Sequence, residues 1–170
     1  LLLQHISMRN NKETIKAWAM FDWSNSAYNL VITSTIFPAY YTIITTTEEF
    51  GDKVVFMGRT FTNTALSNYA LSVAYLIMAL LLPVLSSIAD FRGNKKIFMK
   101  VFTYIGSISC AGLFFFKLET LELGIICFTL AAIGYIGGVM FNNSYLPEIA
   151  TIDQQDRVSA KGFAYGYIGS

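Results

Sequence analysis

The sequence contains little of what a water-soluble protein needs on its surface. Only 14% of its 170 residues are charged and 54% are hydrophobic, with a mean hydropathy of +0.50. A soluble globular domain carries about 25% charged residues. Because so few charged side chains are available to face water, we expect lipid to cover much of the chain, which predicts a membrane protein.

Histidine and cysteine are also nearly absent. His5 is the single histidine, and Cys110 and Cys127 lie apart, each within an apolar run. A metal cluster, a disulfide framework or a Cys–His catalytic pair requires more such residues at closer spacing. The sequence therefore predicts no bound metal and no cofactor. It predicts no enzymatic activity either, since no nucleophile–base pair is visible.

Long tracts of one charge are missing as well. The 12 basic and 11 acidic residues leave a net charge of +1, which argues against a nucleic-acid partner. Residues 1–7 precede Met8, the more natural start, and their apolar stretch is too short for the core of a signal peptide. We interpret residues 1–7 as an upstream extension or a cloning remnant.

The chain does contain a series of uncharged apolar runs. A membrane-spanning helix needs about 20 such residues. We predict an all-α membrane protein with four complete transmembrane helices and the start of a fifth, at about residues 17–41, 65–89, 97–116, 123–146 and 162–170. Nine of the 12 Lys and Arg residues fall on one side of this arrangement, so the positive-inside rule predicts a cytoplasmic amino terminus.

The first predicted helix has aromatic residues near both ends. Trp18 and Trp23 lie at one end and Tyr40 and Tyr41 at the other, which is typical of residues at the two membrane interfaces. Pro38 is expected to kink or end this helix. The charged segment 48–64 that follows predicts an external loop.

Polar side chains recur along this first helix at offsets of 3, 4, 7 and 11, which places them on one helical face: Asp22, Asn25, Ser26, Asn29 and Thr33. An ionised carboxylate costs about 2.5–3.5 kcal/mol at the centre of a membrane and less near its edge. Asp22 follows Lys16 by six residues, or about 9 Å of helix, so we expect it in the cytoplasmic third. Two interpretations stay open. Either this face lines an aqueous cavity that binds a cation, a proton or a polar substrate, or Asp22 is an interfacial residue, solvated or paired with a basic loop.

Small residues in the fourth and fifth predicted helices follow the GxxxG pattern of close helix contacts. Gly134 and Gly138 form one such pair, and Gly162 and Gly166 form the other. They predict tight packing within a helical bundle. Asn142, near the end of the fourth helix, is expected to cap that helix or to bond to a neighbouring one.

The loop between the second and third predicted helices, residues 86–96, resembles the signature loop of the major facilitator superfamily. That signature is Gly-x-x-x-Asp-Arg/Lys-x-Gly-Arg-Arg/Lys, and Asp90, Gly93 and Lys95 match it. Three positions depart from it: Ser86, Phe91 and Asn94.

Two longer segments resemble one family within this superfamily, the vacuole-effluxer-like proteins. Residues 18–28, Trp-Ala-Met-Phe-Asp-Trp-Ser-Asn-Ser-Ala-Tyr, are similar to the first helix of that family. Leu-Pro-Glu-Ile at 146–149, with residues 157–159 and 162–169, resembles its junction between helices four and five. A complete member has twelve helices. The resemblance therefore implies that residues 1–170 are the amino-terminal part of a single transporter domain, a major-facilitator-type helical bundle.

The resemblance implies transport by alternating access, in which two six-helix halves move about a central cavity. It assigns roles to two further groups, the gating-loop residues Asp90, Arg92, Gly93 and Lys95 and the junction-motif residues Pro147, Glu148 and Arg157. The implied cargo is a small polar solute, with amino acids as the first expectation. The other implied partners are the lipid bilayer and the remaining carboxy-terminal helices. The implied location is a bacterial inner membrane, or a vacuolar membrane in a eukaryote.

Two alternatives remain open at this stage. A cation-coupled sugar symporter of a related family also favours Leu-Pro-Glu after the fourth helix, as at residues 146–148. If 170 residues is the natural length, the chain would instead be a non-transporting membrane scaffold or sensor.

Overall fold

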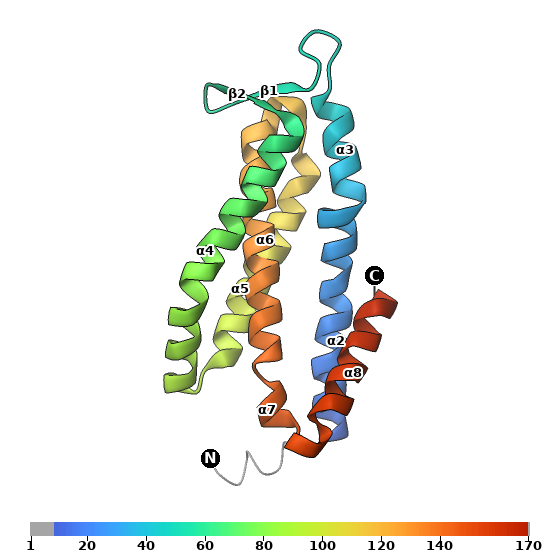
Figure 1. Cartoon of the computed structure of the whole chain (residues 1–170), viewed down its shortest axis with the longest axis vertical. Coiled ribbons are helices and arrows are strands. Elements are labelled where there is room, and N and C mark those ends of the chain that lie inside the picture. The colour runs from blue at the N-terminus through green and yellow to red at the C-terminus, as the bar shows by residue number, and fades with distance from the viewer. Residues whose placement is uncertain (1–8, 170) are drawn as a thin grey trace. The chain divides into compact units, whose positions relative to one another are not determined.

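The computed structural model describes residues 9–169, and most of these are helical, which confirms the all-α fold class (Figure 1). The helical elements are α2 (Lys12–Tyr28), η1 (Asn29–Ser34), α3 (Ile36–Thr45), α4 (Asn63–Arg92), α5 (Lys95–Gly112), η2 (Leu113–Phe115), η3 (Leu118–Thr120), α6 (Leu121–Asn143), α7 (Leu146–Ile149) and α8 (Ile152–Gly169). Two strands, β1 (Lys53–Phe56) and β2 (Arg59–Thr62), pair in an antiparallel hairpin.

Three helical stretches in the described chain are long and apolar enough to cross a membrane: Asn63–Arg92, Lys95–Phe115 and Leu118–Ile149. They coincide with the second, third and fourth predicted spans, in keeping with an integral membrane protein. The fifth predicted span falls within α8, which begins at Ile152 rather than at Gly162. The early turns of α8 carry charged residues, so an apolar run marked only the later part of this helix.

The first predicted helix is interrupted in the structure. After α2 the chain continues into η1, a π-helical turn, and a break follows at Thr35, with φ −131° and ψ −76°. Pro38 lies beyond the break, in the first turn of α3. Proline is tolerated there because an amide N–H in the first turn has no intrahelical acceptor. The helix expected to kink or end at Pro38 is therefore interrupted at Thr35 instead.

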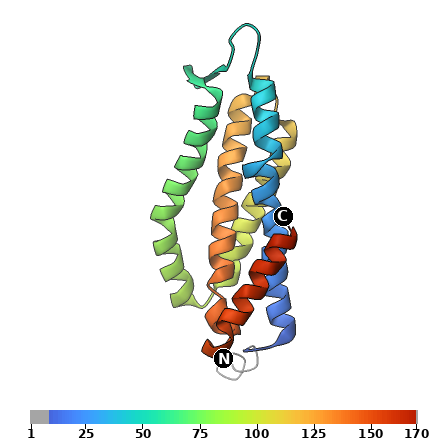
Figure 2. The ribbon, with the colours of Figure 1, turned by 45° about the vertical axis from the view of Figure 1, so that its right-hand side comes forward.

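The described chain separates into two compact units, and each is considered by itself. One unit comprises the chain up to Ser34 together with the chain from Val139 onward. Within it α8 lies beside α2 in both views (Figures 1 and 2). Its core is formed by Trp18, Ala19, Ile149, Ala150 and Val158. This unit holds the predicted polar face of the first helix.

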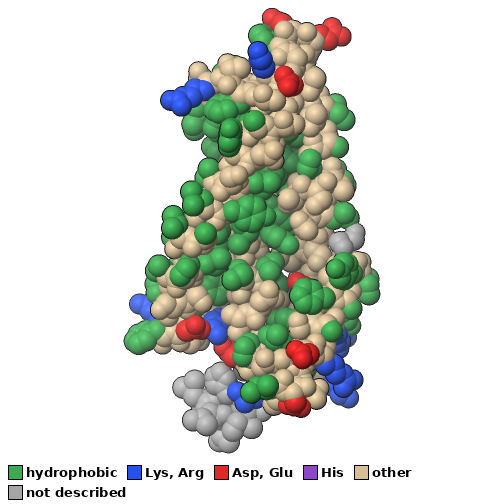
Figure 3. Space-filling model, in the orientation of Figure 1, with side chains coloured by type: hydrophobic (Ala, Val, Ile, Leu, Met, Phe, Trp, Pro, Cys, Tyr) green, Lys and Arg blue, Asp and Glu red, His purple; other side chains and the backbone are tan. Residues whose placement is uncertain are grey.

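The second unit comprises Thr35–Gly138. Aromatic rings of Phe37, Tyr41, Phe116 and Phe128 pack with centroids 4.9–6.0 Å apart. The Tyr41 hydroxyl donates to the carbonyl of Asn63 at 2.9 Å, which ties α3 to the start of α4. Large apolar side chains are exposed along α4 (Figure 3), as expected for a helix that contacts lipid.

The segment expected to be an external loop contains the β1–β2 hairpin. Met57 (φ 49°) and Gly58 (φ 75°) form its two-residue turn, and two positive φ angles suit the twist of paired strands. The backbone N–H of Met57 donates to Glu122 Oε1 at 3.0 Å, which fastens the turn to the start of α6. This long-range bond and the strand pairing are features that the local sequence, which indicated a loop, did not predict.

Candidate functional site

The polar side chains predicted on one helical face divide between two kinds of helix. Asp22, Asn25 and Ser26 lie in α2, whereas Asn29 and Thr33 lie in η1. A π-helix closes its hydrogen bonds from residue i to i+5, so it turns its side chains away from the 3.6-residue period. The spacing on which the prediction depends therefore applies only as far as Tyr28.

Asp22 and Ser26 face α8. A methyl group on Gly166 would lie 3.1 Å from Asp22 Oδ2 and 3.1 Å from Ser26 Oγ. The Ser26 hydroxyl donates to the backbone carbonyl of Asp22 at 2.8 Å. Because Gly166 has no side chain, the backbone of α8 comes close to both side-chain oxygens. Both residues are partly buried.

Asn25 on α2 differs from Asp22 and Ser26 in that it carries an unpartnered hydrogen-bond donor. Its Nδ2 atom is buried and has no hydrogen-bond partner among the residues that the structure describes. A buried donor without an acceptor costs about 1–3 kcal/mol, so this amide is suited to an acceptor on a bound molecule. Asn29 is exposed and Thr33 is partly buried.

Close contact between α2 and α8 confirms the packing predicted from Gly162 and Gly166. A methyl group on Gly162 would lie 2.5 Å from the ring of Trp18, and one on Gly169 would lie 2.2 Å from the carbonyl oxygen of Trp23. Three glycines of α8 thus meet the same side of α2 that carries Asp22. The approach of these two helices sets the position of the Asp22 carboxylate.

Trp18 joins α2 to the end of α6 by hydrogen bonds and lies in the core of the first unit. Its Nε1 donates to the carbonyl of Asn142 at 2.8 Å, and Asn142 Nδ2 donates back to the carbonyl of Trp18 at 3.5 Å. The expectation that Asn142 bonds to a neighbouring helix is confirmed. The interfacial position predicted for Trp18 stays a prediction, and the structure adds that its indole is enclosed, with 9% exposed. No local pattern indicated this, since its partner is 124 positions away in the sequence.

The two residues just before α2 are held at the same end of this unit. The backbone N–H of Asn10 donates to the carbonyl of Ile149 at 2.7 Å, and its side chain bonds to the Thr151 hydroxyl at 2.9 Å. Asn11 then caps α2 by accepting from the backbone N–H of Glu13 at 2.9 Å. These bonds join the beginning of α2 to the segment between α7 and α8.

The predicted gating loop forms a sharp turn in the second unit. Gly93 has a φ of 61°, and Asn94 N–H donates to the carbonyl of Ala89 at 3.0 Å, as in a Schellman helix end. The sharp turn expected at Gly93 is therefore confirmed. Lys95 Nζ lies 2.9 Å from Asp90 Oδ1 across this turn. Arg92, the remaining predicted loop residue, is exposed.

The predicted junction motif forms α7 and the start of α8. Pro147 lies in the first turn of α7, where its missing N–H is harmless, and Glu148 is the acidic residue of that turn. Arg157 is exposed on α8. Hydrogen bonds from the side chains of Thr151 and Gln154 hold the pKa of Asp153 below its usual value. Asp153 therefore stays ionised at neutral pH, which suits the first turn of a helix.

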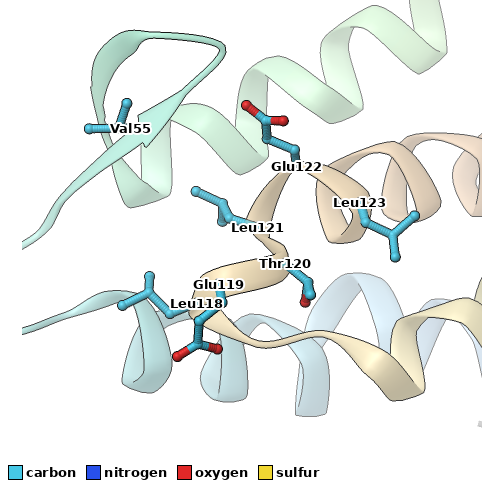
Figure 4. Close-up of a pocket in the computed structure, with 7 residues that line it drawn as sticks. All are labelled: Val55, Leu118, Glu119, Thr120, Leu121, Glu122 and Leu123. Atoms are coloured by element: carbon cyan, nitrogen blue, oxygen red, sulfur yellow. The ribbon is translucent and has the colours of Figure 1, made fainter.

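The second unit also contains a pocket of about 410 Å³, between the hairpin and the start of α6 (Figure 4). It is lined by Val55 and residues 118–123, which include Glu119 and Glu122. Glu122 already accepts the hydrogen bond from Met57. Within residues 9–169 no three His, Cys, Asp or Glu side chains are grouped so that they could hold a metal ion.

Comparison with known proteins identifies the family of this chain. The family described as vacuole effluxer Atg22 like matches residues 10–170. The chain is 35% identical over 154 residues to the uncharacterized MFS-type transporter YxiO of Bacillus subtilis (strain 168). This match covers 91% of the chain but 34% of the relative, so the chain spans about a third of the length of the curated relative it matches. No solved structure matches this chain. The polypeptide belongs to the family described as vacuole effluxer Atg22 like.

Proposed function

We propose that this chain is the amino-terminal part of a secondary active transporter that moves a small polar solute by alternating access. Amino acids are the first candidate for the cargo. Family membership across residues 10–170 supports a transporter. The observation that carries the proposed site is the buried, unpartnered amide nitrogen of Asn25 on α2.

The groups on α2 and η1 are complementary to an amino acid. An amino acid presents a carboxylate, which needs donors, and an ammonium group, which needs acceptors. Asn25 Nδ2 offers a donor without a protein acceptor. Asn29 and Thr33 offer side-chain oxygens from a π-helical turn, an element that recurs at functional sites. In this proposal Asn25 binds the carboxylate of the cargo and the η1 residues bind its ammonium group.

Uptake by the full-length protein in proteoliposomes tests this assignment. With a labelled amino-acid mixture at low concentration, Asn25→Ala is expected to reduce uptake about tenfold or more. A hydrogen bond to a charged group contributes about 1.5–3 kcal/mol. Asn143→Ala, an exposed asparagine at the end of α6, is the matched control and should transport like the parent protein.

Equal uptake by Asn25→Ala and the parent protein would remove Asn25 from the substrate site. A parallel screen with sugars, with and without sodium, separates the two transporter hypotheses. Sodium-dependent sugar uptake without amino-acid uptake would favour the sugar symporter.

Asp90 is proposed to latch the cytoplasmic side of the transporter. Its carboxylate is 58% exposed even though it pairs with Lys95, so it remains accessible to other helices. An exposed ion pair contributes only about 0.2–1 kcal/mol. Asp90→Asn is therefore expected to leave the protein folded and to change the balance of inward and outward states by up to about fivefold.

Labelling of a single cysteine measures this balance in the full-length protein. All native cysteines of the full-length protein, Cys110 and Cys127 among them, are replaced by alanine, and the reporter is introduced at the exposed Ala160 of α8. Lys95→Gln breaks the same ion pair but keeps the Asp90 carboxylate. A latch to other helices requires a larger labelling change for Asp90→Asn than for Lys95→Gln, and equal changes would contradict it.

A further inference from the structure

We infer that the first two turns of α5 form a binding site for an anionic phospholipid. Lys96 and Lys100 hold its phosphate, and its acyl chains lie along an exposed apolar face of the same helix. The inference goes beyond the proposed transport function, because it concerns the outer surface of one helix and involves no cargo.

Positive charge is concentrated around the turn that joins α4 to α5 (Figure 1). Four cations lie within nine residues: Arg92, Lys95, Lys96 and Lys100. Asp90 is the one acidic residue of segment 86–104, and it pairs with Lys95 at 2.9 Å. The other three cations are exposed and form no ion pair with the residues that the structure describes. The segment therefore has an excess of positive charge that an external anion would balance.

The start of α5 adds to this excess. The N-terminus of a helix is the positive end of its dipole, where acidic side chains are favourable and cations are not. The first turn of α5 contains Lys95 and Lys96 and no acidic residue. Within the described chain, the side chain of its N-cap residue, Asn94, makes no capping hydrogen bond. An anion beside these lysines would be stabilised both by their charge and by the helix dipole.

An exposed apolar face of α5 begins beside the same lysines. Its members recur at offsets of 4, 7 and 11 and are all exposed: Ile97, Val101, Tyr104 and Ile108. Another side of α5 is buried, with Phe102 and Ser109. On that side a methyl group on Gly106 would lie 3.5 Å from Gly134 of α6. The apolar face is therefore turned away from α6.

Lys100 connects the cations to the apolar face. Lys96 precedes it by four residues and Tyr104 follows it by four, so the three side chains lie along one side of α5. The stretch Lys95–Phe115 is long and apolar enough to cross a membrane, which puts the lysines at the end of such a crossing. The long side chain of Lys100 can extend back toward the headgroups.

This arrangement is complementary to a phospholipid with a net negative charge. Such a lipid has an anionic phosphate at the end of apolar acyl chains, and α5 has unpaired cations at the end of an apolar face. Basic clusters next to a membrane-spanning helix attract anionic lipids. The site is thus argued from charge and apolar surface together.

Native mass spectrometry of the purified full-length protein measures the affinity for a single lipid. Phosphatidylglycerol is titrated into the protein in detergent. The double variant Lys96→Gln/Lys100→Gln is expected to bind it at least about fivefold more weakly than the parent, which is the contribution of one basic residue near anionic lipid. Lys53→Gln/Arg59→Gln removes two exposed cations from the hairpin, which precedes the other end of α4, and is the matched control. Equal affinities of the two double variants would overturn the inference.

Two other ligands and a conservative variant test each part of the site. Phosphatidylcholine has acyl chains but no net charge, so the parent should bind it at least about fivefold more weakly than phosphatidylglycerol. Glycerol phosphate has the anion without the chains and should not displace the lipid at equal concentration. Equal affinity for the two lipids would contradict the role of the lysines, and displacement by glycerol phosphate would contradict the role of the apolar face. Lys96→Arg/Lys100→Arg keeps both charges and should bind like the parent.

A spin label on α5 shows whether lipid or protein covers the apolar face. The native cysteines of the full-length protein are replaced by alanine, and the protein is placed in nanodiscs that contain phosphatidylglycerol. A label at Tyr104→Cys, where the parent side chain is 65% exposed, should be several-fold more accessible to oxygen than one at Ser109→Cys, where it is buried. Equally low accessibility would mean that other helices cover this face, and would overturn the lipid site. Neither measurement depends on transport, so a parent protein that moves no amino acid would contradict the proposed function alone.

Discussion

Replacing Gly134 with alanine is expected to destabilise the protein by about 3 kcal/mol, at the upper end of the range for overpacking. A methyl group at this position would lie 2.3 Å from the backbone nitrogen of Gly106 and 2.7 Å from the carbonyl oxygen of Phe102. Both obstacles are backbone atoms of α5, so no side chain can rotate away. The two helices would have to separate, and their other contacts would weaken.

The facing residue provides a matched control for this prediction. A methyl group on Gly106 would lie 3.5 Å from the nearest atoms of Gly134, which is an ordinary contact distance. Gly106→Ala is therefore expected to be neutral, or slightly stabilising, because alanine is a better helix former than glycine. Thermal unfolding followed by circular dichroism in one detergent compares the two variants. Equal losses of stability would refute the asymmetric packing of α5 and α6.

Removing the Trp18 side chain is the second change with a large expected effect. Trp18→Ala deletes the largest side chain of the first unit's core and should destabilise that unit by about 3–5 kcal/mol. Trp18→Phe keeps most of the apolar volume but leaves the buried carbonyl of Asn142 without its 2.8 Å bond. Because the Asn142 carbonyl keeps the bond from the Tyr145 N–H at 3.1 Å, the loss for Trp18→Phe is expected to be about 0.5–1.5 kcal/mol.

Trp23→Phe is the control for Trp18→Phe. It removes an indole that is not in the Trp18–Asn142 hydrogen bond, so the difference between the two variants reports the contribution of that bond. The Trp23 side chain is 42% exposed, so Trp23→Phe should change stability by less than about 0.5 kcal/mol. Thermal unfolding followed by circular dichroism compares the variants. If Trp18→Phe unfolds at the same midpoint as Trp23→Phe, the bond to Asn142 does not stabilise this unit.

Features that depend on neighbouring residues were predictable from the sequence. Continuous apolar runs identify α4, α5 and α6 as long and apolar enough to cross a bilayer, because length and hydropathy are properties of a local segment. The turn at Gly93 was predictable because glycine adopts a positive φ without steric cost. The GxxxG pair in α8 likewise predicted a close helix contact, since small residues permit one wherever a partner helix is available.

The candidate site was predicted only in part. Asp22 and Ser26 were recognised as polar residues on one helical face, but the sequence could not indicate that this face meets Gly166. The role of η1 was missed because a π-helical turn has no distinctive local pattern, and a regular helix was assumed through residue 33. The amide of Asn25 became significant only when its surroundings showed that it is buried without an acceptor.

By itself, the sequence determined that this is an α-helical membrane protein, that α4, α5 and α6 are long and apolar enough to cross a bilayer, and which residues resemble those of its family. The tertiary structure decided which aromatic side chains are buried. Trp18 and Tyr41 are enclosed, with Tyr41 2% exposed, whereas Trp23 and Tyr40 remain accessible. The physical reason is that burial and hydrogen-bond partners depend on residues that are distant in sequence and adjacent only after folding. Hydropathy, in contrast, is a sum over residues that are already neighbours along the chain.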